Sequence, residues 1–452
     1  MWTKTNKVFL HRQDTLFSYM SRARVIILSN FTQFYTILHN SIQFYTTLYN
    51  STPMKNSFTI SLLFLLLFVT TANADALQGF RYEDATKFQI INKGWDNTTE
   101  PYTRLPQQFL DSCREEQAWL YNHSAGIAVR FATNSKRIAA QYNLKNNFHM
   151  QHMAMTGIKG TDLYYLNEQR NVWEHVNTAR PQEKNLIADS IQSKLYVENL
   201  DGEMHEYMIY LPLYDGINWL QIGVDSTAEL TMPRVENPRQ MGKIVIYGTS
   251  IQQGGCASRV GMVPSAIIQR EYNLECVNLA TSGNARMDFY IAEALASIED
   301  AICYVIDPVP NCTEDRCDTA TYDFINILRT LRPEVPIIMV EGIMYPYTRH
   351  DSYFADYLPK KNAAFRRGYD LHKAENPKGL YYMTHDGQIG PEMEGTVDGV
   401  HLTDYGFRAY ADLLEVKIKE ALDDTDVDYD LTPSYNIVRP KSWWERLLDL
   451  FR

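Results

Sequence analysis

The chain has 452 residues, of which 45% are hydrophobic, and its formal net charge at pH 7 is −11. This length and apolar content are sufficient for a globular core and predict roughly two to three domains. The negative charge is dispersed and no long basic tract occurs, which argues against nucleic acid as a partner. Tyrosine is abundant, with 30 residues; aromatic side chains on a surface often stack on sugars, but they are also ordinary core and interface residues, and taken alone this content favours the packing role.

The N-terminal part of the chain has the pattern of an export signal. Residues 54–74 begin with a charged stretch, continue with an apolar stretch and end in the small-x-small sequence Ala72-Asn-Ala74. This pattern predicts a secretory signal peptide, and its apolar part is short for a membrane-spanning helix. We therefore expect a secreted or periplasmic protein without stable membrane insertion after cleavage, and residues 1–53 as an upstream extension from a misassigned start. An uncleaved signal anchor is the alternative.

Residues 75–232 show short stretches of alternating polar and apolar residues. Regular short strands that are separated by polar or glycine-containing turns, without helices, predict a β-sandwich, in one version a jelly roll. A proline-containing linker is expected over residues 233–242. The predicted strands cover residues 127–132, 137–142, 194–197, 205–211 and 220–224.

From residue 243 to residue 422 predicted strands and helices alternate. This alternation indicates a parallel sheet covered on both faces, that is, a three-layer α/β/α domain, whose ligands bind at the carboxyl ends of the strands. The predicted strands cover residues 243–247, 276–279, 301–307, 335–340 and 379–383, and the helices 264–272, 289–298, 318–331, 356–375 and 403–422. Residues 423–452 are expected to form an acidic, solvated tail and a short amphipathic helix.

Six cysteines follow the predicted signal peptide. Export permits disulfides, and Cys312 and Cys317, which flank a short loop, are the best candidate pair. Cys276 and Cys303 lie in predicted strands and are expected to be buried thiols. No pair of Cys-x-x-Cys elements occurs, so a structural zinc site is not predicted.

Two short segments carry the chemistry. An apolar run ends in Gly248-Thr-Ser250, which predicts a buried strand that delivers a serine to the edge of a sheet. The segment Asp398-Gly-Val-His401 can supply a histidine that activates this serine and an aspartate that orients the histidine. The pairing predicts acyl transfer, with ester hydrolysis as the leading reaction. Each segment alone also fits a structural role, a helix N-cap for the first and a turn for the second.

The chain resembles the SGNH hydrolase superfamily of GDSL-like esterases and lipases. More closely, it is similar to two-domain esterases whose N-terminal β-domain carries a Gly-x-Asp-Leu-Tyr motif, which stands here as Gly160-Thr-Asp-Leu-Tyr164. The resemblance covers roughly residues 80–422. It implies that Ser250 is the nucleophile, that His401 is the base and that Asp398 holds the base.

The resemblance also implies an oxyanion hole, a set of donors for the negative oxygen that forms during acyl transfer. Its members would be the N–H groups of Ser250 and Gly283 and the side-chain amide of Asn311. The familiar Gly-x-Asn-Asp block is absent, and Asp307-Pro-Val-Pro-Asn311 stands in its place. The assignment of Asn311 as a donor therefore rests on its position after a predicted strand. The alternative is that this loop serves packing alone.

Four further residues have assignments outside this set. Asp162 and Tyr164 are predicted at the domain interface or the rim of the cleft, and a role in folding alone is equally compatible. His385 follows the last predicted strand and is placed at the same edge, either lining the pocket or as an alternative base. His149 and His152 have metal-like spacing, but no carboxylate or cysteine completes a site, so they are predicted as surface or domain-interface residues.

The combined prediction is a secreted serine esterase that needs no metal and no other cofactor. Its expected substrate is an acylated carbohydrate or another small ester with a short acyl group, acetyl above all. A lipase-like or phospholipid acylhydrolase is the alternative enzyme. A carbohydrate-binding protein on an inactive hydrolase scaffold is the alternative from another class, because a fold does not fix a function.

Overall fold

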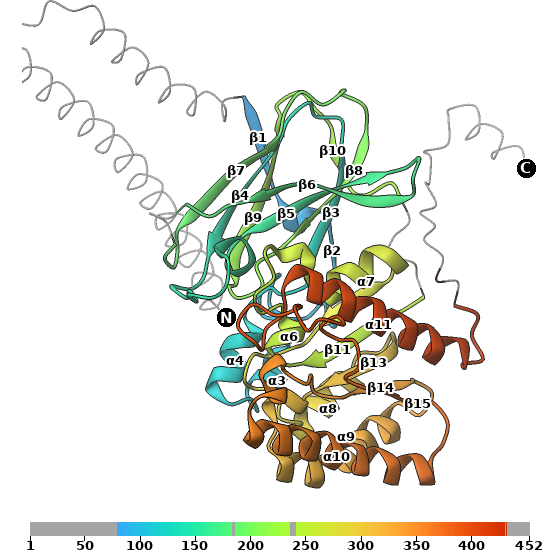
Figure 1. Cartoon of the computed structure of the whole chain (residues 1–452). Coiled ribbons are helices and arrows are strands. Elements are labelled where there is room, and N and C mark those ends of the chain that lie inside the picture. Colours follow the sequence, from blue (N-terminus) through green and yellow to red (C-terminus); the bar gives the residue numbers. More distant parts are fainter. Residues whose placement is uncertain (1–78, 183–185, 236–240, 430, 432–452) are drawn as a thin grey trace, which may run out of the picture. The chain divides into compact units, whose positions relative to one another are not determined.

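The computed structural model describes residues 79–182, 186–235, 241–429 and 431. The predicted signal peptide, the extension before it and the predicted C-terminal amphipathic helix lie outside the described residues. All described residues belong to one compact unit, in which a β-sandwich is followed by layers of strands and helices (Figure 1). None of the helices in this part of the chain combines the length and the apolar character that crossing a bilayer requires.

The β-sandwich consists of two sheets of antiparallel strands. The first sheet has the order β1-β9-β4-β7, with β1 (Phe80–Asp84), β4 (Ile138–Leu144), β7 (Ile191–Val197) and β9 (Ile217–Asp225). The second has the order β10-β3-β8-β5-β6, with β2 paired to β3; its strands are β2 (Gln89–Ile91), β3 (Ala128–Thr133), β5 (Thr161–Asn167), β6 (Val172–Ala179), β8 (His205–Tyr210) and β10 (Leu230–Thr231). Alternate residues of both sheets point inward, so that Phe131, Tyr142 and Leu163 meet in one buried core. The predicted β-sandwich is confirmed.

The prediction that this region lacks helices is wrong. Three short α-helices lie in its connections, α3 (Gln107–Leu110), α4 (Glu115–Tyr121) and α5 (Met155–Ile158), besides a 3₁₀ helix at Ala85–Lys87. Helices of four to seven residues make at most two turns, too few for a helical period to appear in the sequence. Helices α3 and α4 lie between β2 and β3, and α5 lies between β4 and β5, so all three connect strands of the sandwich.

The second half contains one parallel sheet with helices on both faces. The strand order is β12-β11-β13-β14-β15, with β11 (Lys243–Gly248), β12 (Glu275–Asn278), β13 (Ala301–Asp307), β14 (Ile337–Val340) and β15 (Leu380–Met383). The α-helices are α6 (Ser250–Gln253), α7 (Pro264–Tyr272), α8 (Phe289–Ala296), α9 (Glu314–Leu331), α10 (Ser352–Glu375) and α11 (Asp404–Asp423). The predicted three-layer domain is confirmed.

Residue alternation along β11 shows how both faces of this sheet are covered. Ile244 and Ile246 pack in one cluster with residues of α7 and α11, whereas Val245 and Tyr247 pack in another with residues of α8, α9 and α10. Figure 1 shows these two helix groups on opposite sides of the sheet. Since β11 lies between β12 and β13, the ends of these three strands meet at one edge.

Candidate active site

Ser250 lies in a tight turn between β11 and α6. Thr249 is the N-cap of α6, and its hydroxyl accepts a hydrogen bond from the N–H of Ile251 at 3.4 Å. A side chain at Gly248 would meet Gln252 Cγ at 2.5 Å, so the turn requires glycine there. The segment therefore does both things that its sequence allowed: Thr249 caps a helix, and Ser250 stands at the end of the strand. Ser250 is buried, with 7% of its surface exposed.

His401 and Asp398 approach Ser250 from the loop before α11. His401 Nε2 lies 2.9 Å from the Ser250 hydroxyl oxygen, and His401 Nδ1 lies 2.8 Å from Asp398 Oδ2. The other oxygen of Asp398 accepts hydrogen bonds from the N–H groups of Val400 at 3.0 Å and His401 at 2.8 Å. The three side chains thus form a continuous chain of hydrogen bonds.

The charge of Asp398 determines which groups donate and which accept within this series of hydrogen bonds. Burial alone would raise the pKa of Asp398, but the hydrogen bonds from the His401 ring and from two N–H groups outweigh it and lower the pKa to about 2. The carboxylate is therefore ionised at neutral pH and accepts a hydrogen bond from the Nδ1–H group of His401. The lone pair of Nε2 then faces the serine hydroxyl, which is the arrangement that a general base requires.

Gly283 and Asn311 follow the two strands that flank β11. The N–H of Thr281 donates to the Gly248 carbonyl at 2.9 Å, which ties the loop of Gly283 to the serine turn. Gly283 has φ +69°, and no atom lies within 4 Å of the position that a side chain would take. Asn311 Oδ1 accepts the N–H of Ala285 at 3.3 Å, so its amide NH₂ group is left as a donor. The structure brings the segments of all the predicted oxyanion residues to the same edge.

Asp307, the last residue of β13, is a buried carboxylate beneath this edge that sequence reasoning did not single out. Its Oδ2 accepts hydrogen bonds from Gln252 Nε2 at 3.1 Å and from the Tyr410 hydroxyl at 2.8 Å. Burial raises the pKa of Asp307 to about 7, although both hydrogen bonds act in the opposite direction. The carboxyl group thereby connects β13, the serine helix α6 and helix α11.

Asp162 and Tyr164 lie on one face of β5, between the sandwich and the loop that follows α6. Asp162 Oδ2 accepts hydrogen bonds from Arg259 Nη1 at 2.8 Å and from the N–H of Gly261 at 2.9 Å. Arg259 Nη1 also donates to the Tyr164 hydroxyl at 2.6 Å. Both motif residues are buried, with 0% and 2% exposure, and they therefore hold the loop rather than face the solvent.

His385 lies in a separate ion pair. Its Nδ1 is 2.7 Å from Glu341 Oε2, and this hydrogen bond raises the pKa of His385 against the opposing effect of burial. Glu341 follows β14 and His385 follows β15, so the pair lies at the same edge of the sheet as Ser250. The base position beside the serine hydroxyl is taken by His401.

The statement that no carboxylate or cysteine completes a site around His152 is wrong. His152, Cys256, Asp398 and His401 each offer one ligand atom, and these atoms all lie within 4.8 Å of one another. His152 reaches this place from the loop before α5, in the other half of the molecule. Spacing along the sequence could not show this approach, because it arises only where the sandwich packs on the α/β layers.

Arg104 is a second residue without a signal in the sequence. Its guanidinium group is buried and donates to the carbonyl groups of Asn278 at 3.0 Å and Ala280 at 2.8 Å, just before the loop of Gly283. It also donates to the carbonyl groups of Leu120 and His123. Burial lowers the pKa of Arg104 to about 10, which leaves the group charged at neutral pH and able to fix the end of β12.

All six cysteines are free thiols in the structure. Cys276 and Cys303 are fully buried in β12 and β13, as predicted. Cys312 and Cys317 form no disulfide; their thiols lie in hydrogen-bond contact, and that of Cys312 also donates to the Ala285 carbonyl at 3.7 Å. The two groups are thus neighbours, as their spacing suggested, but without the bond.

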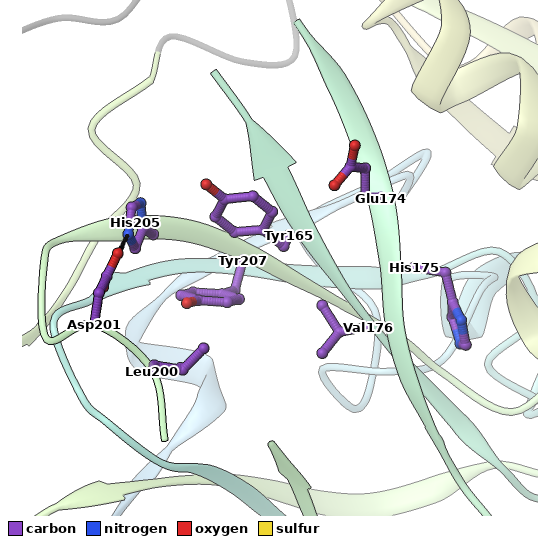
Figure 2. A pocket seen from close by; sticks show the side chains of 8 residues that line it. All are labelled: Tyr165, Glu174, His175, Val176, Leu200, Asp201, His205 and Tyr207. Carbon is purple, nitrogen blue, oxygen red and sulfur yellow. Dashed lines mark hydrogen bonds and ion pairs between the residues drawn. The ribbon is translucent and has the colours of Figure 1, made fainter. Parts of the chain in front are cut away.

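A shallow recess on the β-sandwich contains none of the predicted site residues. Its volume is about 240 Å³, and Asp201 Oδ2 and His205 Nε2 lie in hydrogen-bond contact at 3.0 Å on its wall. Figure 2 shows the residues that line it: Tyr165, Glu174, His175, Val176, Leu200, Asp201, His205 and Tyr207. The hydrogen-bonded group at Ser250 is therefore the candidate active site.

Comparison with known families divides the chain at the same place as the fold. A family model described as the GDSL-like lipase/acylhydrolase family matches residues 241–419. A second model, described as the N-terminus of SGNH-hydrolase-type esterases and named for the Gly-x-Asp-Leu-Tyr motif, matches residues 80–230. No curated protein matches the chain.

Solved structures resemble the chain over both halves. A protein of Bacteroides ovatus described as a GDSL-like lipase has 30% sequence identity and a TM-score of 0.71, and the match covers 76% of this chain and 98% of that one. A salicylyl-acyltransferase from a tetracycline biosynthetic pathway has 15% identity and a TM-score of 0.60 over the same shares of the two chains. A family two carbohydrate esterase from Cellvibrio japonicus is a looser match, with 12% identity and a TM-score of 0.49 over 76% of this chain and 98% of that one.

Proposed function

We infer that this chain, which belongs to the GDSL-like lipase/acylhydrolase family and has its GxDLY-type N-terminal domain, is a serine esterase that acts through Ser250, His401 and Asp398. The observation that carries this proposal is the chain of hydrogen bonds from Ser250 Oγ to His401 Nε2 (2.9 Å) and from His401 Nδ1 to Asp398 Oδ2 (2.8 Å). A serine hydroxyl is a weak nucleophile until a base accepts its proton.

The first half of the reaction forms an acyl-enzyme. Ser250 Oγ attacks the carbonyl carbon of the ester while His401 Nε2 takes the hydroxyl proton, and Asp398 stabilises the imidazolium ion. The negative oxygen of the intermediate accepts hydrogen bonds from the N–H groups of Ser250 and Gly283 and from the side-chain amide of Asn311. When the intermediate collapses, His401 gives its proton to the leaving alcohol.

The second half returns the free enzyme. Water takes the place of the alcohol, His401 accepts its proton, and the hydroxide attacks the acyl carbon. The serine oxygen then leaves with a proton from His401, and the carboxylic acid is released. Each of the oxyanion donors is expected to contribute a factor of about 10²–10³ to the rate.

The proposed substrates are short acyl esters, acetyl esters of carbohydrates first among them. Ser250 is only 7% exposed, which favours a small acyl group over a long chain. The export signal predicted at residues 54–74 supports a location outside the cytoplasm, where polymeric carbohydrate would be available as a substrate. No metal or other cofactor takes part in the proposed steps.

Hydrolysis of p-nitrophenyl acetate by the full chain, beside its Ser250→Ala variant, tests the reaction. Turnover that disappears in the variant while circular dichroism shows an intact fold would support the serine mechanism. Acetate release from acetylated glycans, compared with fatty-acid release from phospholipid vesicles, then separates the carbohydrate esterase from the lipase-like alternative. A folded wild-type chain that binds glycans without any turnover would overturn the proposal in favour of a binding protein.

A further inference from the structure

We propose that His152, Cys256, Asp398 and His401 form an inhibitory binding site for a divalent transition metal of zinc type. The four ligand atoms lie within 4.8 Å of one another and come from three separate loops. His152 belongs to the sandwich, Cys256 follows α6, and the other two precede α11. The site shares Asp398 and His401 with the proposed catalytic mechanism, so its inhibitory effect rests on the proposed function, but it would bind metal whether or not the chain hydrolyses esters.

The distances are close to those of a tetrahedral site. His401 Nδ1 lies 2.8 Å and His152 Nε2 lies 4.0 Å from Asp398 Oδ2, and the centroids of the two imidazole rings are 5.3 Å apart. Ligand atoms around a zinc ion are separated by about 3.3–3.8 Å, given Zn–N and Zn–S bonds of about 2.0–2.3 Å. The group would have to contract by about 1 Å at its widest, and the side chain of His152, which is 32% exposed, has room to do so.

The donor types select the metal. One thiol, two imidazoles and one carboxylate are the ligands of zinc and its neighbours, whereas magnesium and calcium require sets made of oxygen atoms. Binding replaces the proton of the Cys256 thiol by the metal and releases that proton to the solvent. The Cys256 thiol already points at the His152 loop, because it donates to the His152 carbonyl at 3.4 Å.

The loop that carries His152 is held in place by buried charges. The Lys159 ammonium group forms a fully buried ion pair with Asp215 and donates to the Asn146 carbonyl at 2.6 Å. Asp215 Oδ1 in turn accepts the backbone N–H of Asn146 at 3.0 Å. These contacts fix the start of the loop, so His152 is presented to the other three ligands without a large ordering step.

Coordination would stop the reaction whichever nitrogen of His401 binds. A metal on Nδ1 displaces the hydrogen bond to Asp398 and leaves the ring proton on Nε2, where it blocks acceptance of the serine proton. A metal on Nε2 occupies the lone pair itself. Inhibition is therefore expected to be complete at saturation and to be reversed by a chelator.

Metal binding is best measured on the Ser250→Ala variant of the full chain without a polyhistidine tag. This variant retains all four ligands and lacks the nucleophile, so binding is observed independently of esterase activity. Native mass spectrometry with Zn²⁺ is expected to show one ion per chain, and Co²⁺ is expected to give the absorption bands of a tetrahedral thiolate complex. If the thiolate band is absent, so that the bound ion is not coordinated by Cys256, the proposal is overturned.

A second set of variants connects binding to inhibition. His152→Asn is expected to weaken Zn²⁺ binding at least about tenfold and to raise the inhibitory concentration in parallel. His149→Asn, on the same loop but outside the ligand group, is the matched control and should behave like the wild type. Equal inhibition of the His152 variant and the wild type would refute the site. Metal binding to Ser250→Ala together with no esterase activity in the wild type would refute only the proposed function.

Discussion

The buried carboxylate of Asp162 provides the sharpest test of how the sandwich supports the active site. It accepts hydrogen bonds from Arg259, from the N–H of Gly261 and, at 2.6 Å, from the Thr178 hydroxyl. Removing one partner of a buried ion pair costs about 3–5 kcal/mol, and the lower end applies because the Arg259 side chain is 23% exposed. At about 2 °C per kcal/mol for a large domain, we expect Asp162→Ala to lower the melting temperature by about 6 °C.

Thermal unfolding and steady-state ester hydrolysis, the latter well below the melting temperature, measure the two consequences separately. We expect an unchanged KM, because Asp162 has no exposed surface and contacts the loop after α6 from behind. Thr178→Val is the matched control: it removes one hydrogen bond to the same carboxylate, about 1 kcal/mol, and should lower the melting temperature by about 2 °C. A raised KM at an unchanged melting temperature would refute this reasoning and place Asp162 in contact with the substrate.

Three further predictions concern residues at the edge of the parallel sheet. Asp398→Asn is expected to lower kcat by about 10⁴, because the amide favours the wrong tautomer of His401; a wild-type rate would exclude Asp398 as the partner of the base. Asn311→Ala should lower kcat by about 10²–10³ at unchanged KM, whereas a change in KM alone would assign Asn311 to substrate binding. Burial raises the pKa of Asp307 to about 7, so the folded protein binds this proton more tightly than the unfolded chain does. Stability should then fall by up to roughly 4 kcal/mol as the pH rises from about 4 to 7, and urea unfolding should show a flatter dependence in Asp307→Asn; an identical slope in both proteins would contradict this cause.

The α/β half could be predicted well because its signals are local. A strand that is covered on both faces is continuously apolar, as in residues 244–247, and the short length of such runs together with their β-branched residues favours a strand over a helix. The boundaries were missed where polar residues begin a helix. Helix α9 begins at Glu314, four residues before the predicted start, because Thr313 caps it and its first turn carries the acidic pair Glu314 and Asp315.

The contribution of the sandwich to the site could not be predicted in the same way. Asp162 and Tyr164 were named through a motif, but only the register of β5 shows that both lie on one face while Leu163 points into the sandwich core. Arg104 carries no pattern at all, and the spacing of His149 and His152 did not show which residues His152 would meet. The positions of Arg104 and His152 depend on how two separately patterned regions pack, which is a property of the tertiary structure and has no local signal.

The shared apolar cluster sets limits on how this architecture can be taken apart. Tyr210 and Leu213 of the sandwich pack in the same cluster as Ile246 and Ile251, which lie beside the nucleophile. Arg104 crosses the interface between the two halves and donates hydrogen bonds to four carbonyl groups. A graft that exchanged the sandwich for that of another esterase would expose this cluster and leave the carbonyl groups unpaired. The two halves therefore have to evolve together, because a substitution on one side of their packed interface requires a compensating substitution on the other side.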